Sequence, residues 1–572
     1  MGGRWLLYFN TIRYLKPSQV LWRVWRKLPV FPSPNAGPAP ALRRCAQPFA
    51  ALPPKKPSLT GPDAFRFLNR DGRVRSAADW NDPQADALWL YNLHYFDDLC
   101  ADGAEARREW HEALIARWIA ENSVARGVGW DPYPLSLRVV NWIKRALADG
   151  AVNPHPAHGG DAVARGLSAA AIQSLAMQAR TLARRVEWHL LGNHVLANAK
   201  ALVFAGCFFE GGKAEAWLNQ GLAILRDQLA EQVLADGGHF ERSPMYHAIV
   251  LEDLLDLINL SRSFPEALPA DQVQALREAT VRMLRWAQVM THPDGGIAFF
   301  NDAAFGIAAG VAALARYAER LGLASFGFAS IGDASARLVH LEQSGYVRLA
   351  RGPFTVLFDA APVGPDYLPG HAHADTLAFE LSHGAQRVIC NSGTSCYGRS
   401  ELRHQERSTA AHNTVEIDGE NSSEVWDGFR VARRAYPVAL SCAEDADALR
   451  VSCAHDGYTR LRGRPMHRRT IEVSEGAVRW TDEVTGEGAH RMVGRIPLHP
   501  DVTARRLGEA QWQLDLPSGT KLVLAVETAG VSLDEEQGRF SPEFGLTLER
   551  QVLVWMVEGP LPVSVSVRLT PC

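Results

Sequence analysis

The chain of 572 residues is too long for one ordinary hydrophobic core, so two or three domains are expected. Hydrophobic residues make up 47% of it and charged residues 22%, which excludes a disordered or fibrous protein. The formal net charge of −3 argues against a strongly basic nucleic-acid binder, so an anionic ligand would need a local basic patch. Eight scattered cysteines lack CxxC spacing, which is unlike a disulfide framework or a Cys-ligated zinc site.

The N-terminus carries an apolar patch from Trp5 to Phe9. Asn10, Arg13 and Lys16 interrupt its extension, and no small-residue cleavage site follows. The segment therefore does not match a secretory signal, and no later run is long enough to span a bilayer. An interfacial amphipathic helix is the alternative for this segment. Residues 28–63 contain ten prolines and are interpreted as an extended strap leading to the main body.

From about residue 84 to 322 the apolar residues recur at helical spacing. Many antiparallel helices in a row indicate a bundle, a solenoid or a closed toroid of helix pairs, and the absence of a fixed-period repeat disfavours a regular solenoid. The expected helices are Ala104–Asn122, Pro134–Ala148, Ala162–Trp188, Asn193–Gly206, Lys213–Leu234, Met245–Ser263 and Asp271–Met290.

After about residue 335 the apolar period changes to two. Short strands with frequent turns and no intervening helices indicate an antiparallel sandwich. The chain is thus expected to fold as a helical domain followed by a β domain, with the site in the cleft between them. The expected strands are Ser344–Ala350, Pro353–Ala360, Thr376–Leu381, Arg387–Cys390, Arg469–Val473, Ala477–Glu483, Lys521–Glu527 and Pro562–Leu569.

Two segments of the helical half combine polar residues with the start of a helix. Asn193 and His194 precede the expected helix from Val195, where Asn193 could simply be an N-cap. Tyr246 falls in the first helical turn after a glycine-rich polar loop, where a packing role is the plain alternative. Trp130 and Tyr133 could offer aromatic surface to sugar faces.

In the β half, His371 and His373 follow a Pro-Gly and precede an alternating apolar stretch. If that segment is extended, both imidazoles point to one face, which favours a metal site, a proton-transfer site, or both. The plain alternative is one solvated and one locally bonded histidine. His412 on a later strand completes a candidate ligand set of His373, Asn391 and His412, although an Asn carbonyl is a poorer ligand than a carboxylate.

A basic cluster follows these histidines along the chain and could meet an anionic ligand, although a solvated charged face is an equal alternative for each member. It comprises Arg399, Arg403, Arg407, Arg430, Arg433 and Arg434.

Five short motifs follow one another along the chain: Gly-Asn-His before a helix, Ser-Pro-Met-Tyr-His, Gly-His-Ala-His-Ala-Asp, Asn-Ser-Gly-Thr and Ala-His-Asn-Thr-Val. In this order the chain resembles the heparinase II/III-like polysaccharide lyases over roughly residues 85–435. The resemblance implies an α+β multidomain fold, with an N-terminal (α/α) toroid followed by a C-terminal antiparallel β-sandwich. It also implies β-elimination on uronic-acid polysaccharides.

The same resemblance implies roles for single residues. Asn193, helped by His194, would neutralise the substrate carboxylate, and Tyr246 would act as base and acid. His371 would be a second proton-transfer residue, and Tyr397 lies near the place of a second tyrosine in some members. No cofactor is required. A structural Zn²⁺ on His373 and His412 is conditional, because Asn391 stands where metal-binding members have an aspartate. Substrate binding is expected from Trp130, Tyr133, His239, Arg242, Arg403 and Arg407.

The expected domains are residues 1–63 for the N-terminal helix and strap, 64–334 for the toroid, and 335–572 for the β-sandwich. The expected partner is an anionic polysaccharide, not nucleic acid, and the oligomeric state stays open. Family resemblance suggests the cell envelope or periplasm, with the cytoplasm as the alternative. The Trp-Asp-Pro-Tyr-Pro-Leu-Ser pattern resembles a subgroup associated with capsular and exopolysaccharides.

Two rival functions remain. A glycoside hydrolase on the same toroid needs two carboxylates facing one cleft. Its candidates are Asp236, Glu241, Asp294 and Asp302. A non-catalytic polysaccharide-binding or assembly protein would need none of the proton-transfer residues.

Overall fold

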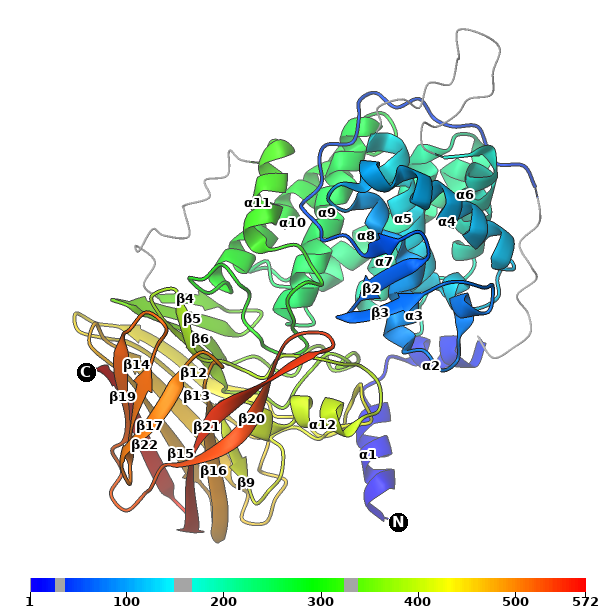
Figure 1. Cartoon of the computed structure of the whole chain (residues 1–572). Helices are drawn as coiled ribbons and strands as arrows, with labels where there is room; N and C mark the ends of the chain where they lie inside the picture. The colour runs from blue at the N-terminus through cyan, green and yellow to red at the C-terminus, as the bar shows by residue number, and fades with distance from the viewer. Residues whose placement is uncertain (1, 26–36, 149–166, 324–337) are drawn as a thin grey trace.

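The computed structural model describes residues 2–25, 37–148, 167–323 and 338–572 (Figure 1). A helical domain in the first half of the chain lies on a domain of antiparallel sheets in the second half, as the sequence predicted. The expected boundary at residues 334 and 335 lies outside the described residues.

Two short helices open the chain. Helix α1 (Gly2–Ile12) projects from the body beside the β domain, and α2 (Pro17–Trp25) leads toward the helical domain (Figure 1). Trp426 of the β domain donates to Thr11 of α1 at 3.1 Å, which ties the helix to that domain. A small three-stranded sheet precedes the toroid, with β1 (Leu59–Gly61), β2 (Ala64–Phe67) and β3 (Arg70–Arg73).

The helical domain is organised around α7 (Gly192–Phe208), whose residues are nearly all buried. Its sequence combines small residues, chiefly alanines, with large apolar ones, which lets neighbouring helices pack closely on several sides, so it forms the centre of the domain core. The other α-helices are α3 (Ala87–Tyr95), α4 (Arg108–Glu121), α5 (Pro132–Ala148), α6 (Ala169–Leu182), α8 (Gly212–Gln232), α9 (Pro244–Ser263), α10 (Ala270–Val289) and α11 (Val311–Arg320). In the described part of this domain, short 3₁₀ turns precede or link these helices: Asp79–Asn81, Asp97–Cys100, Ala104–Arg107 and Val128–Trp130.

The β domain consists of antiparallel sheets, and strands such as β14 (Met466–Val473) alternate buried and half-buried side chains. Trp480 and Phe379, from two different sheets, pack edge to face with ring centroids 5.2 Å apart, so the sheets share one core. A five-stranded sheet contains β4 (Leu338–Leu341), β5 (Tyr346–Arg351), β6 (Phe354–Asp359), β7 (Phe379–His383) and β8 (Gln386–Ile389).

The remaining strands form an eight-stranded, a four-stranded and a two-stranded sheet. The eight-stranded sheet adds to β14 the strands β12 (Pro437–Glu444), β13 (Leu449–His455), β15 (Val478–Thr485), β17 (Thr503–Gly508), β18 (Gln511–Asp515), β19 (Lys521–Val526) and β22 (Val563–Pro571). The four-stranded sheet holds β9 (Val415–Ile417), β16 (Ala489–Pro497), β20 (Asp534–Glu543) and β21 (Leu546–Pro560). The two-stranded sheet pairs β10 (Val425–Trp426) with β11 (Arg430–Val431), and α12 (Glu401–Arg407) and a 3₁₀ turn at Thr409–Ala411 precede both.

Two expected elements differ from those observed. The helix expected over 162–188 is present only as α6 (Ala169–Leu182): residues 162–166 lie outside the described part of the chain, and residues 183–188 are not helical. The strand expected from Thr376 begins only at Phe379, because Leu377 has a φ of +67° that breaks an extended chain. His371 and His373 therefore lie in a loop before β7 and not on a strand.

No helix in the described ranges combines the length and apolarity that crossing a bilayer requires.

Candidate active site

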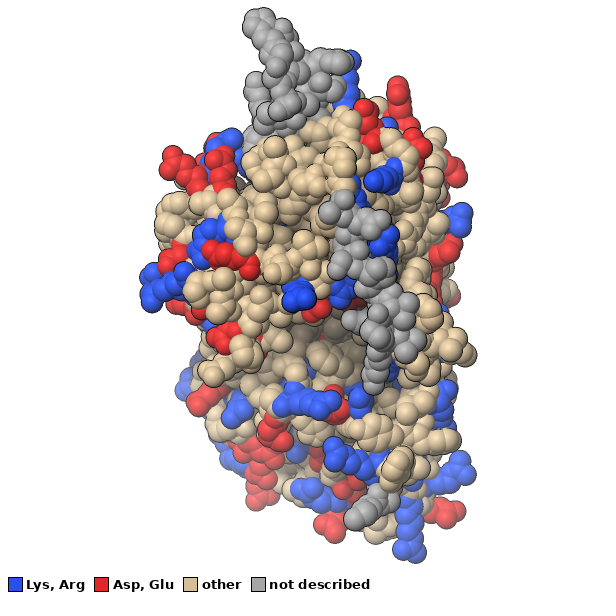
Figure 2. All heavy atoms as spheres, turned by 90° about the vertical axis from the view of Figure 1, so that its right-hand side faces the viewer, with Lys and Arg blue, Asp and Glu red and all other residues tan. Residues whose placement is uncertain are grey.

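A deep cleft of about 1260 Å³ lies between the helical and β domains. Side chains from α5, α7 and α9 line it on the helical side, and Tyr397 and Phe429 line it on the other. Helix α1 also reaches it through Tyr8, Thr11 and Ile12. Figure 2 shows the surface hollowed between the two domains. A cleft of this size accommodates several sugar units of a polymer.

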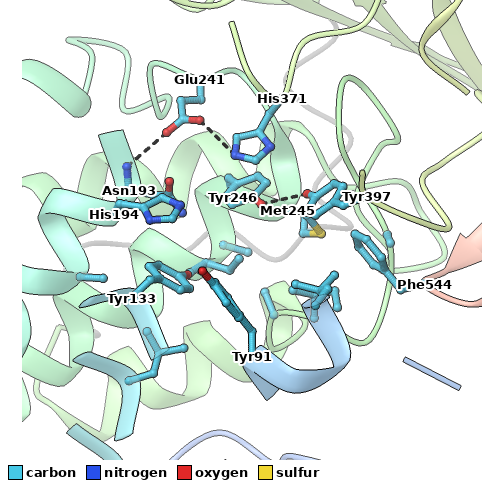
Figure 3. Close-up of a pocket in the computed structure, with 18 of the residues that line it drawn as sticks. Tyr91, Tyr133, Asn193, His194, Glu241, Met245, Tyr246, His371, Tyr397 and Phe544 are labelled. Atoms are coloured by element: carbon cyan, nitrogen blue, oxygen red, sulfur yellow. Dashed lines mark hydrogen bonds and ion pairs between the residues drawn. The ribbon is translucent and has the colours of Figure 1, made fainter. Parts of the chain in front are cut away.

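On the helical side, the start of α7 presents Asn193 and His194 to the cleft (Figure 3). The His194 ring lies 4.5 Å from that of Tyr133, and its Nδ1 lies 3.1 Å from the Glu187 carboxylate. Burial alone would lower the pKa of His194, but the nearby Glu187 carboxylate raises it above the ordinary value. The start of a helix and a histidine biased toward its charged form together favour a bound anion.

Glu241 lies between this anion-binding side and the proton-transfer residues. It accepts a hydrogen bond from the Asn193 backbone N–H at 3.3 Å, and its Oε2 lies 3.6 Å from Nε2 of His371. Burial raises the pKa of the Glu241 carboxyl, against the lowering influence of His371.

Tyr246 stands in the first turn of α9, where the Ser243 hydroxyl caps the helix by accepting from the Tyr246 backbone N–H at 3.2 Å. Its hydroxyl lies 2.8 Å from that of Tyr397, across the domain interface. Its ring stacks on His371 with centroids 3.8 Å apart. Burial raises the pKa of both phenols well above the ordinary value, so both are protonated at neutral pH in the free protein.

Asp302, in the loop after α10, contacts both His371 and His373. Its Oδ2 lies 2.9 Å from Nδ1 of His371, and its Oδ1 lies 2.9 Å from Nε2 of His373. Arg403, fully buried, donates to both of its oxygens. Burial alone would raise the pKa of Asp302, but Arg403 and the two histidines hold it well below the ordinary value.

The ionised Asp302 fixes the tautomer of His371. Its carboxylate accepts a hydrogen bond from Nδ1–H, so in the neutral ring the lone pair is on Nε2, which faces the cleft beside Glu241. A carboxylate-held imidazole with a free nitrogen is suited to accept a proton from a bound substrate.

Behind the His371–Asp302 pair lies a buried group of side chains that could hold a metal ion. His373, Asp375 and His412 each offer a ligand atom within 4.8 Å of the others. Nδ1 of His373 faces Nε2 of His412 at 3.2 Å, which is close to the separation that two zinc-bound imidazole nitrogens have in a tetrahedral site. Burial lowers the pKa of both imidazoles, so both are neutral, as ligands must be.

The outer contacts of these rings test the fit further. Asp302 accepts from Nε2 of His373, and the Asn391 carbonyl oxygen lies 3.0 Å from Nδ1 of His412. Both outer partners are acceptors, so both inner nitrogens carry lone pairs that a cation would satisfy. Asn391 thus lies on the far side of His412 from His373, and Asp375 takes the third place that the sequence assigned to Asn391.

The residues expected to bind substrate are mostly not at the cleft, and this expectation is corrected. Tyr133 lines it. Trp130 is buried against Trp118 at a centroid distance of 5.7 Å, and His239 is fully buried beside Gln232. Arg242 donates to the Ser344 carbonyl at 3.0 Å and lies outside the cleft lining.

The two arginines expected to bind substrate are buried as well. Arg403 pairs with Asp302, and Arg407 donates to the carbonyls of Ala372 and Gly428 at 3.0 and 2.9 Å. Burial lowers the pKa of Arg407 to about 9. Both hold the loop of His371 in place and are not available to a ligand.

The other arginines of the predicted basic cluster are paired with carboxylates. Arg399 and Arg430 both contact Asp427. Arg433 pairs with Glu424, and Arg434 with Asp366. The cluster is therefore not a free patch for a highly charged ligand.

Sequence reasoning did not assign Glu241, Asp302 or Asp375 to the lyase site. Glu241 and Asp302 were recognisable only as polar residues in loops next to helix ends, and were considered for a hydrolase. Asp375 stands two residues after His373, a spacing that could have marked it as a third ligand.

Two family matches cover most of the chain. Residues 167–319 match the family described as "Heparinase II/III N-terminus", and residues 333–568 match "Heparinase II/III-like, C-terminal".

Related proteins and folds agree with these matches. "FtsZ-localized protein C" of Caulobacter vibrioides is 27% identical over 73% of this chain and 70% of its own length. "Heparin-sulfate lyase" of Bacteroides thetaiotaomicron is 26% identical over 49% of this chain, which spans only 42% of that relative. A crystal structure of heparinase III has the same fold, with a TM-score of 0.66, 18% identity, and coverage of 88% of this chain and 79% of that one.

Proposed function

The chain belongs to the heparinase II/III-like family of polysaccharide lyases, and we propose that it cleaves a polysaccharide containing uronic acid by β-elimination. The expected toroid and β-sandwich are confirmed by the fold. The uronate substrate and the roles of single residues are proposals, supported by the geometry of the cleft.

The reaction begins with a proton that is hard to remove. The C5–H of a uronate is weakly acidic, because the adjacent carboxylate already bears a negative charge. Donors that hold this carboxylate make the enolate-like intermediate accessible, and each positioned donor is worth roughly 2 to 4 kcal/mol. Asn193 and the charged form of His194, side by side at the start of α7, fit this role (Figure 3).

The two proton transfers fit different residues. Nε2 of His371, left free by Asp302, is positioned to take the C5 proton, and Glu241 can stabilise the imidazolium that results. Tyr246 is protonated in the free protein and shares its hydroxyl contact with Tyr397, which suits donation to the leaving glycosidic oxygen. The combined base-and-acid role first expected of Tyr246 is thereby divided between Tyr246 and His371.

One observation supports this proposal most directly: the hydrogen-bonded pair His371–Asp302 and the hydroxyl pair Tyr246–Tyr397 lie together at one cleft. Elimination leaves an unsaturated sugar with new ultraviolet absorbance, whereas hydrolysis leaves two saturated ends. An absorbance screen against heparan sulfate, alginate, hyaluronan and bacterial capsular polymers tests the proposal. Product from one of them, absent with Tyr246→Phe, is expected. Saturated products only would indicate hydrolysis, and no product would favour the non-catalytic alternative.

The hydrolase rival has little support in the cleft. Of its four candidate carboxylates only Glu241 lines the cavity. Asp302 is paired with Arg403, Asp294 with Arg387, and Asp236 accepts from the Ser344 hydroxyl. A facing pair of free carboxylates, which hydrolysis requires, is not found among these four.

The proposal needs no cofactor for the proton transfers. A metal held by His373, Asp375 and His412 would be structural, because it would fix the His373 ring that shares Asp302 with His371. For the polymer we propose an anionic cell-envelope polysaccharide, in exopolysaccharide or capsule metabolism. Cell fractionation distinguishes an envelope location from the cytoplasmic alternative.

A further inference from the structure

The two N-terminal helices expose an unusual amount of apolar surface. Ten of the seventeen exposed large apolar side chains in the described part of the chain lie on α1 and α2. Trp5, Phe9 and Leu21 are 78%, 64% and 69% exposed. A soluble surface helix normally hides such side chains, so this face is suited to a partner.

The side of these helices that faces the protein is polar instead. Asn10 and Gln19 are buried, and Gln19 donates to the Tyr367 carbonyl at 3.2 Å. Thr11 accepts from Trp426 of the β domain. The usual arrangement, with apolar residues inward and polar residues outward, is thus reversed, and the polar contacts hold the helices in place with their apolar face outward.

The charge of this region identifies the chemistry of the partner. Residues 1–62 contain ten lysines and arginines and not one aspartate or glutamate, although the whole chain has a net charge of −3. Arg4 and Arg13 lie in or next to α1, and Arg23 lies in α2. Basic residues beside exposed tryptophans match an anionic lipid surface, where indole rings lie at the headgroup level.

We propose that α1 and α2 bind peripherally to the surface of an anionic lipid bilayer, with their apolar side chains inserted at the headgroup boundary. A second copy of the chain fits less well, because pairing two such faces would bring like positive charges together. Tyr8 and Ile12 of α1 also line the cleft, so binding through this face places the cleft opening next to the membrane. A polymer attached to or emerging from the membrane would then meet the site directly.

Flotation of the full chain with lipid vesicles tests this inference. The chain is expected to float with vesicles of phosphatidylcholine mixed with phosphatidylglycerol, and much less with phosphatidylcholine alone. The triple variant Trp5→Ser, Phe9→Ser, Leu21→Ser should bind the mixed vesicles at least roughly tenfold more weakly, because three apolar insertions are lost. Arg4→Gln and Arg13→Gln should each weaken binding roughly fivefold, and high salt should mimic them.

The double variant Leu507→Ser, Met556→Ser is the matched control. It removes two side chains that are 54% and 51% exposed on the β domain, so its binding to vesicles should equal that of the parent chain. Thermal melting checks that each variant folds. No flotation with the mixed vesicles, or equal flotation of the triple variant, would overturn the inference. Light scattering could also overturn it, by showing that the parent chain is a dimer and that the triple variant is a monomer. The apolar face would then join two copies of the chain.

Discussion

Asp302 holds His371 through a 2.9 Å contact with Nδ1 and leaves the other ring nitrogen free at the cleft. The same carboxylate accepts hydrogen bonds from His373 and from the buried Arg403. Asp302 therefore orients the proposed base and also neutralises a buried arginine. The two histidines share this partner although their loop is not a strand.

Asp302→Asn should therefore lose both stability and activity. Removing the charge leaves the buried Arg403 uncompensated, at a cost of about 3–5 kcal/mol in the free energy of unfolding. His371→Ala removes the proposed base but keeps the pairing of Asp302 with Arg403, so it should lose activity with a much smaller stability loss. Urea unfolding and product absorbance, measured for both variants, check the difference. Equal stability losses would contradict the central role of Asp302.

Tyr246→Phe should separate the two proton transfers. The phenol proton is needed at the leaving oxygen, so elimination should fall roughly 10²- to 10⁴-fold. His371 would still remove the C5 proton, so unreacted substrate kept in D₂O should gain deuterium at C5, as seen by NMR. His371→Ala should lose this exchange.

Tyr458→Phe is the control for that variant. Tyr458 is buried in the β domain and donates to the Val415 carbonyl at 2.7 Å, away from the cleft lining. Its loss should cost about 1 kcal/mol of stability and no activity. If Tyr246→Phe abolished exchange as well as cleavage, Tyr246 itself would be the base, as the family resemblance first implied.

The helices and strands could be predicted because their periods are local. Most expected elements match those observed within a few residues, and Tyr246 lies in the first turn of α9, as expected, after its Ser243 cap. Asn193 also lies at a helix start, but the N-cap of α7 is Leu191 and no side chain caps it, so the N-cap role expected of Asn193 is wrong. The pairing of charges is not local. Arg403 meets Asp302 across 101 residues, so nothing in the sequence distinguished a buried structural arginine from one that binds substrate.

The third residue of the candidate metal group could not be predicted for the same reason, because its position depends on contacts between distant parts of the chain. A His-x-His pattern marked His373, but only the path of the folded chain places Asp375 beside His412 and turns Asn391 to its outer nitrogen.

His194 should make substrate binding depend on pH. Its pKa is raised in the folded protein by Glu187, so its positive charge, and the stability that the pair contributes, are present below about pH 6.5 and are lost as the pH rises through the raised value. KM for a uronate polymer should rise as the pH increases from about 6.5 through the raised pKa of His194, while kcat changes less. His194→Gln should flatten the profile, whereas His383→Gln, outside the cleft lining, should leave it unchanged. A profile unaltered by His194→Gln would remove this residue from carboxylate binding.

Gly192→Ala should damage the anion-binding side without replacing a polar side chain. Gly192 has a φ of +59°, and an added Cβ would lie 2.4 Å from Leu368 and 2.7 Å from the Glu241 carboxylate. The start of α7 must then shift, which should lower kcat/KM and cost roughly 1–2 kcal/mol of stability. Gly212→Ala, at the start of α8 with open space around it, is the matched control and should be neutral. Full activity of Gly192→Ala would show that the position of Asn193 is not critical.

The metal group makes a prediction that metal analysis and melting can check. Zn²⁺ should raise the melting temperature of the protein, a chelator should lower it, and His412→Ala should abolish both effects, because binding to the folded state alone stabilises it. Asn391→Asp should tighten binding by roughly 10- to 100-fold, since a carboxylate on Nδ1 makes the His412 ring a better ligand.

His455→Ala is the control for these metal variants. It removes a buried histidine that faces His467 at 3.4 Å, but that pair has no third ligand, since within the described ranges His373, Asp375 and His412 form the one such group found. The response of this variant to Zn²⁺ should therefore equal that of the parent chain. If neither Zn²⁺ nor chelator changes the melting of the parent, the two inner nitrogens must share a proton instead, with the Asn391 amide turned to donate to His412.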